Sequence, residues 1–207
     1  MSPSPRLLAL AATLSLASAC SILPKTEPVD IYRLPVHQAA GSATPASWSL
    51  RLNKPLASEA LAGPRIAVIP QGDVISSYKG ARWSDPVPML VRNRLLDGFQ
   101  RDGRVQRLSA DDANLQADYE LGGELQAFQS EYRAKDQVEV VIRYDARLVQ
   151  GRSQRILASK RFEVRQPLTG SQVPSAVAGF GAASDQLARQ VIDWTVSQAA
   201  QAQAKNQ

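Results

Sequence analysis

Alternation of apolar and polar positions predicts three long strands in the second half of the chain. Apolar side chains recur at every second position in residues 119–127, 138–148 and 156–164, with polar or charged side chains between them. This period of two is typical of strands that bury one face. Short connections around Ala134 and Gly151 indicate an antiparallel meander. We expect the charged face of these strands to be solvated.

Two other segments have the period of an amphipathic helix. Residues 87–103 place their apolar side chains on one side of a helical wheel, and residues 173–204 carry an apolar stripe at spacings of three and four. Upstream, residues 48–52 alternate as a strand, and residues 65–69 form an apolar run that suits a strand buried on both faces. This order predicts an α+β fold, a two-layer sandwich whose largely antiparallel sheet has two amphipathic helices packed on one face.

The N-terminal pattern indicates secretion. An uncharged apolar run follows Arg6 and ends at Cys20, the only cysteine in 207 residues. A membrane-spanning helix needs roughly 20 apolar residues, so this shorter run reads as a signal peptide with small residues before its processing site. Residues 16–20 resemble a bacterial lipobox, which predicts lipidation of Cys20. The alternative is a cleaved soluble periplasmic protein, which would leave an unpaired thiol in an oxidising compartment.

These patterns divide the chain into three parts. We expect a signal peptide over residues 1–19, a lipidated cysteine and proline-rich tether over residues 20–47, and a single α+β domain over residues 48–207. Within the tether, residues 31–34 form a short apolar island, which we interpret as an edge strand or a segment docked on the domain. Ser21 follows the cysteine where an aspartate usually signals retention in the inner membrane, and by that sorting convention the lipoprotein goes to the outer membrane.

Charge and cysteine content argue against a nucleic-acid-binding arm and against an internal disulfide. Removing residues 1–19 removes Arg6, so the formal net charge falls from +5 to +4. The sequence has no block of five or six like charges, which argues against a nucleic-acid-binding arm. A second cysteine is absent, so the domain has no internal disulfide and depends on packing.

The sequence offers no convincing catalytic, metal or cofactor site. The single histidine, His37, lies in the proline-rich tether, where a zinc site or a nucleophile–histidine pair is hard to build. Asp111 and Asp112 could suggest a metal pair, but their surroundings favour a capped turn. We therefore predict a protein that is not an enzyme and binds no cofactor.

One segment is a candidate partner-binding site. Residues 76–86 place two aromatic and two cationic side chains ahead of the first helix, and Tyr78, Arg82 and Trp83 are of the types that anchor interfaces. In the alternative interpretation Trp83 packs locally against the first turn of that helix.

Several short motifs in order resemble the ABC-type transport auxiliary lipoproteins. The resemblance spans nearly the whole mature chain. It rests on Cys20–Pro24, Tyr32–Leu34, Ile66–Val68, Tyr78, Ala81–Trp83, Asp85–Pro86, Ser159–Phe162 and the closing helix with Trp194.

The resemblance implies a non-enzymatic role at the outer membrane. Members of this family look like lipid-anchored partners of mammalian-cell-entry (MCE) domain proteins in ABC transporters that move lipids between membranes. The expected partners are therefore an MCE-domain protein and the outer membrane, with a second copy of the chain as a further candidate and no nucleic acid. The alternative function is a lipoprotein that assembles or braces another envelope complex without handling lipid.

Overall fold

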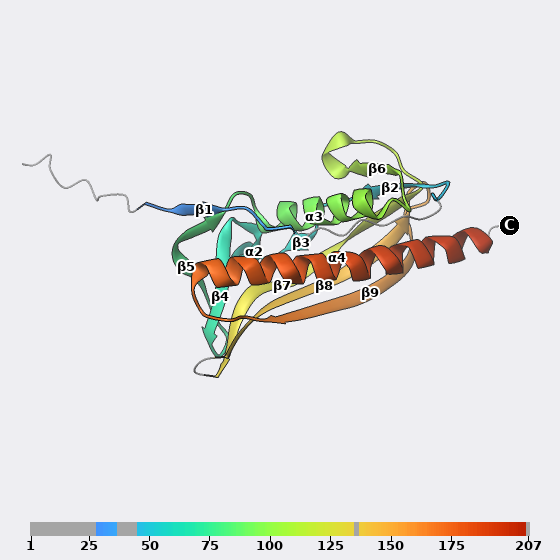
Figure 1. Cartoon of the computed structure of the whole chain (residues 1–207). Helices are drawn as coiled ribbons and strands as arrows, with labels where there is room; N and C mark the ends of the chain where they lie inside the picture. Colours follow the sequence, from blue (N-terminus) through green and yellow to red (C-terminus); the bar gives the residue numbers. More distant parts are fainter. Residues whose placement is uncertain (1–27, 37–44, 135–136, 206–207) are drawn as a thin grey trace, which may run out of the picture.

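A computed structural model describes residues 28–36, 45–134 and 137–205. Two long helices, α3 and α4, lie over a curled sheet, which confirms the α+β class (Figure 1). The elements are β1 (Asp30–Tyr32), β2 (Ser49–Leu52), β3 (Leu56–Ala57), α2 (Glu59–Ala62), β4 (Arg65–Gln71), β5 (Val74–Trp83), α3 (Val87–Asp102), β6 (Arg107–Ala110), the 3₁₀ helix η2 (Asp111–Ala113), β7 (Tyr119–Ala134), β8 (Gln137–Gln150), β9 (Arg155–Pro167) and α4 (Val173–Ala204).

The predicted meander is confirmed, and its strands are longer than the alternating pattern indicated. β7 pairs antiparallel with β8, and β8 pairs antiparallel with β9, along almost their whole lengths. On its other side β7 pairs in parallel with β2, β3 and β4 in turn. The sheet is therefore mixed, and "largely antiparallel" holds only for the meander and for the β4–β5 pair. β7 has 16 residues, long enough to take three short strands one after another on one edge.

Both predicted helices are confirmed and contribute to one core. Leu187 and Val191 in α4 are 2% and 0% exposed, as their place on the apolar stripe predicts. α3 ends at Gly103, whose φ of 76° is left-handed and whose N–H bonds to the Phe99 carbonyl. The two helices lie side by side: a Cβ built on Gly98 of α3 would be 3.0 Å from the Ile192 side chain of α4.

The outer face of the meander carries paired charges. Arg161 and Asp145 lie 2.6 Å apart, and Arg143 and Glu163 2.8 Å. Such exposed pairs contribute little to stability each, so this face is mainly a solvated surface, as its alternating pattern predicts.

The N-terminal segment 28–36 packs on the domain. We call this segment the strap, and it contains the edge strand β1. β1 pairs in parallel with β5, and Leu34 is 8% exposed within the core. Arg94 of α3 donates hydrogen bonds to the carbonyl oxygens of Leu34 and Pro35 and forms an ion pair with Asp185 of α4. The edge-strand interpretation of residues 31–34 is thus confirmed. The folded unit begins before residue 48, because this strap belongs to the same core.

Candidate functional site

The segment that holds Tyr78, Arg82 and Trp83 is the strand β5. β5 continues through Gly80, whose φ of 65° only glycine adopts freely. Around this glycine the pairing is irregular. Between two successive pairs, Arg65 with Arg82 and Ala67 with Ser77, β4 moves by two residues whereas β5 moves by five. Successive side chains of a strand point to opposite faces, so Arg82 and Trp83 are separated.

Trp83 is a core residue. Its side chain is 0% exposed and makes edge-to-face contacts with Phe128 and Phe180, at ring-centroid distances of 6.2 and 5.2 Å. The prediction of an exposed anchor at Trp83 is therefore wrong. The packing interpretation is right in kind, but the aromatic contacts come from β7 and α4 and not from the first turn of α3.

Tyr78 and Arg82 differ in their availability to a partner. Tyr78 is half-buried, and burial raises the pKa of its hydroxyl despite the neighbouring Ser130. Arg82 is exposed and lies directly between Ile31 and Arg65 on the face opposite Trp83. Partner binding by these two residues stays a prediction. Cys20 and His37 lie outside the described residues.

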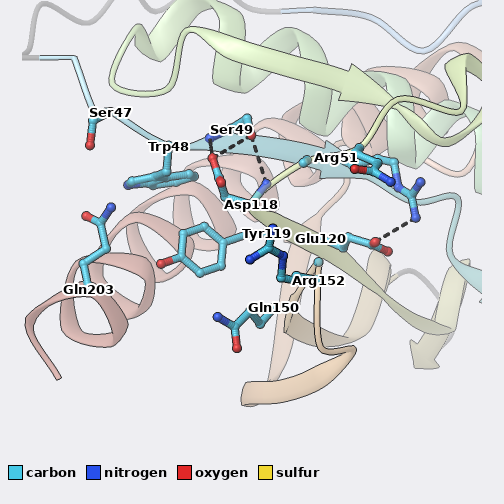
Figure 2. A pocket seen from close by; sticks show the side chains of 13 residues that line it. Ser47, Trp48, Ser49, Arg51, Asp118, Tyr119, Glu120, Gln150, Arg152 and Gln203 are labelled. Atoms are coloured by element: carbon cyan, nitrogen blue, oxygen red, sulfur yellow. Dashed lines mark hydrogen bonds and ion pairs between the residues drawn. The ribbon is translucent and has the colours of Figure 1, made fainter. Parts of the chain in front are cut away.

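An open pocket of about 920 Å³ is lined by residues that include Gln203 near the end of α4 (Figure 2). Figure 1 shows that this end of α4 lies far from β1. The start of β2, the approach to β7, the end of β8 and the last turn of α4 meet there. The residues that line it are Ser47, Trp48, Ser49, Arg51, Gln116, Ala117, Asp118, Tyr119, Glu120, Gln150, Gly151, Arg152 and Gln203. Sequence analysis missed this site, because its walls come from four distant segments.

Asp118 joins the two strands that form the pocket wall. Its carboxylate accepts hydrogen bonds from the backbone N–H and the hydroxyl of Ser49, at 2.8 and 2.7 Å. The Ser49 hydroxyl in turn accepts a 2.9 Å bond from the Asp118 N–H. These hydrogen bonds lower the pKa of Asp118, because they favour its charged form.

Glu120 forms a second polar junction in the same wall. Arg51 lies 2.8 Å from its carboxylate, and the amides of Asn53 and Gln154 each donate to it at 3.1 Å. Burial of this carboxyl raises its pKa, but the three donors together outweigh burial, so the pKa lies below its usual value.

An aromatic pair completes the pocket. Trp48 and Tyr119 meet edge to face with ring centroids 5.3 Å apart, and Gln203 of α4 lies beside them (Figure 2). Trp48 and Tyr119 are only 4% and 6% exposed. The two rings therefore pack into the base of the pocket and leave little ring surface for stacking with a ligand. Most of the described lining residues are polar or charged, so the arrangement is suited to hydrogen bonding with a polar surface or segment.

Asp111 and Asp112 form the turn that the sequence favoured over a metal pair. Both carboxylates bind Arg92 of α3, at 2.5 and 2.9 Å, and Asp111 also accepts a 3.0 Å bond from the Lys54 N–H. Within residues 28–36, 45–134 and 137–205, no three His, Cys, Asp or Glu side chains gather as metal ligands.

Acid is expected to weaken the pocket wall. Asp118 and Glu120 have ordinary pKa values of 3.8 and 4.5, and both are lowered in the folded protein. Their stabilising contributions are complete above those ordinary values and are lost as the pH falls through the lower folded values. Urea unfolding followed by circular dichroism between about pH 3 and pH 7 should show stability falling below about pH 4.5. Asp118→Asn should reduce stability at neutral pH and flatten this acid slope. Asp73→Asn, in the exposed β4–β5 turn, is the control, and identical curves for both variants would contradict the assignment.

Comparisons with known proteins agree with this architecture. A family model described as the ABC-type transport auxiliary lipoprotein component matches residues 32–192. Protein XCC0632 from Xanthomonas campestris has a similar crystal structure, with 26% sequence identity and a TM-score of 0.78 over 84% of this chain and 99% of that one. A crystal structure of an uncharacterised protein, 15% identical with a TM-score of 0.61 over 81% of this chain and 98% of that one, shares the fold.

A longer relative extends beyond this chain. The uncharacterised protein bll6063 from Bradyrhizobium diazoefficiens is 32% identical over 167 residues, which cover 80% of this chain and 44% of the relative. The chain thus spans less than half of that relative's length. In the part of the chain that the structure describes, no helix is both long and apolar enough to cross a membrane.

Proposed function

Because this chain belongs to the ABC-type transport auxiliary lipoprotein components, we propose that it is a lipid-anchored periplasmic subunit of an ABC transporter that moves lipids between membranes. In this proposal Cys20 carries the acyl chains, the outer membrane holds the anchor, and an MCE-domain protein is the partner. The protein acts by docking and not as an enzyme. The family match over residues 32–192 is the observation that carries the proposal.

The layout of the domain supports a docking role. β1 lies at one end of the domain, beside the start of α4, whereas the end of α4 lies at the other (Figure 1). Gln203, in the last turn of α4, lines the polar pocket. From Phe180, which contacts Trp83 near the strap, to Gln203 the helix rises about 35 Å. A chain anchored through its N-terminus would therefore present the pocket away from the anchor, toward a partner in the periplasm.

The filled core supports docking over internal lipid storage. Trp83, Phe128, Tyr144 and Phe180 are all 0% exposed in the described structure and occupy the space between sheet and helices. Phe128 and Phe180 stack with centroids 4.8 Å apart. A lipid held in this layer would have to displace close-packed aromatic side chains. We therefore place the lipid in the MCE-domain partner and the contact with that partner at the pocket.

Cys20→Ala is expected to release the protein from the membrane or leave its precursor uncleaved. Acyl chains provide the anchor, since each buried methylene contributes about 0.8 kcal/mol to membrane binding. Fractionation of cell envelopes and the mass of the N-terminal peptide report the result. Ser21→Ala is the control and should be processed as the parent. Normal processing with full membrane retention of Cys20→Ala would rule out lipidation at this residue.

Site-specific cross-linking tests the docking role. A photoreactive amino acid at Gln116 or Gln203 should cross-link to an MCE-domain subunit in intact envelopes, whereas the same group at Ser159, on the exposed β9 edge, should not. Mass spectrometry identifies the adduct. Positions Tyr78 and Arg82 are tested in the same series. Adducts only with an envelope protein from another complex would favour the bracing function.

A further inference from the structure

We propose that the outer face of the β1–β5–β4 edge rests on the headgroup surface of an anionic bilayer. The surface consists of Val29, Ile31, Arg65, Ile75, Lys79 and Arg82, and we call it the basic–apolar patch. The inference rests on the proposed lipidation of Cys20 and adds to it an orientation of the domain and a contact surface for lipid.

Strand register places these side chains on one face. Ile31 pairs with Arg82, and Arg82 pairs with Arg65, so the three lie in a row across β1, β5 and β4. Ser77 pairs with Ala67 on the same face, and Ile75 and Lys79 lie two residues to either side of Ser77. Their neighbours Trp83 and Tyr32 pair on the opposite, core-facing side.

The patch combines exposed apolar side chains with unpaired cations. Val29, Ile31 and Ile75 are 48%, 58% and 44% exposed. Arg65, Lys79 and Arg82 are exposed, and none of them has an ion-pair partner among the described residues. On the meander's outer face, by contrast, Arg143 and Arg161 are each paired with a carboxylate. Apolar side chains flanked by free cations suit an interface with acyl chains below and anionic headgroups above.

The short chain between Cys20 and the patch favours a membrane as the surface that the patch contacts. Pro28 directly precedes Val29 of the patch and lies beside Gly80, the residue after Lys79, since a Cβ built on Gly80 would be 3.9 Å from the Pro28 carbonyl oxygen. Pro28 lies eight positions after Cys20, so the chain between them reaches at most about 29 Å in any conformation. α4 alone is 32 residues and thus about 48 Å long. A lipid on Cys20 therefore keeps the patch near the bilayer, whereas the pocket end can lie well away from it.

A fluorescent label tests this orientation on the acylated, full-length mature protein. Acylation blocks Cys20, so Ile31→Cys supplies a single thiol for a nitrobenzoxadiazole label. Leu115→Cys is a matched control, because Leu115 is 58% exposed, as Ile31 is, and follows η2 toward the pocket end. Both proteins are reconstituted into vesicles of equal parts phosphatidylethanolamine and phosphatidylglycerol. The label at Ile31 should shift to shorter wavelength and be quenched by a nitroxide on the lipid acyl chain, whereas the label at Leu115 should remain aqueous.

Charge reversal tests the cations separately from the anchor. Arg65→Glu and Arg82→Glu, combined with the Ile31 label, should each lower the ratio of docked to undocked protein about fivefold or more while the vesicles still retain the protein. Arg155→Glu, an exposed charge at the start of β9, should leave that ratio unchanged. Salt should weaken docking in the parent, because it screens exposed charges.

The outcomes separate the two proposals. If the N-terminal peptide carries no acyl group, both the anchoring proposal and this inference fail. If Cys20 is acylated and the Ile31 and Leu115 labels behave alike, only the inference fails. If the Ile31 label is shielded in the unacylated Cys20→Ser protein, in buffer without vesicles or detergent, a second copy of the chain covers the patch, and the lipid assignment is overturned.

Discussion

Trp83→Ala should lower the free energy of unfolding by about 3–5 kcal/mol, the usual loss when a buried aromatic side chain is truncated. Trp83 is 0% exposed, and the change would open a void beside the rings of Phe128 and Phe180, which the Trp83 ring contacts edge to face. Urea or thermal unfolding measures the loss. Arg82→Ala, one residue away and exposed on the other face, is the control and should leave stability nearly unchanged.

A second variant at this position tests the polar part of the side chain. The Trp83 Nε1–H is buried without a hydrogen-bond partner in the described structure. Trp83→Phe keeps an aromatic ring and removes this unpaired donor, so it should cost much less than alanine. Weak destabilisation by alanine, together with loss of partner capture, would instead restore Trp83 as an interface anchor.

Arg94→Met should also be strongly destabilising, by about 3–5 kcal/mol, because it breaks a buried ion pair. The Arg94 side chain is 5% exposed and connects Asp185 of α4 with the carbonyl oxygens of Leu34 and Pro35. Methionine retains much of the apolar stem but donates no hydrogen bond, so the strap loses its link to α3. We expect faster hydrogen exchange in residues 30–35 as well as a lower unfolding free energy.

Arg101→Met is the matched control on the same helix. Arg101 pairs with Asp97 at 2.8 Å, and both side chains are about one-third exposed. Such a pair, four residues apart on a helix, is worth about 0.3–0.5 kcal/mol. Equal losses for the two variants would show that the strap is not held through Arg94. Global destabilisation without faster exchange in the strap would assign Arg94 to helix–helix packing alone.

The sequence by itself determined the elements that depend on local periodicity. The meander and both long helices could be predicted because neighbouring positions reveal which face each segment buries. The bounds of α4 agree with the stripe from Val173, and the buried run at residues 65–69 became β4. The secretory leader and the lipidation of Cys20 stay predictions that rest on contiguous residues, which are what processing enzymes read.

Only the tertiary structure decided which of these elements meet. The parallel pairings of β2, β3 and β4 with β7 have no local signature, because their partners lie far along the chain. The burial of Trp83 depends on β5 continuing through Gly80 to meet α4, so composition could not distinguish an anchor from a core residue. The pocket is built by contacts such as Ser49 with Asp118, which are 69 residues apart. Periodicity shows that a side chain is buried or exposed on its own element, whereas a site forms where the packing of distant elements brings such side chains together.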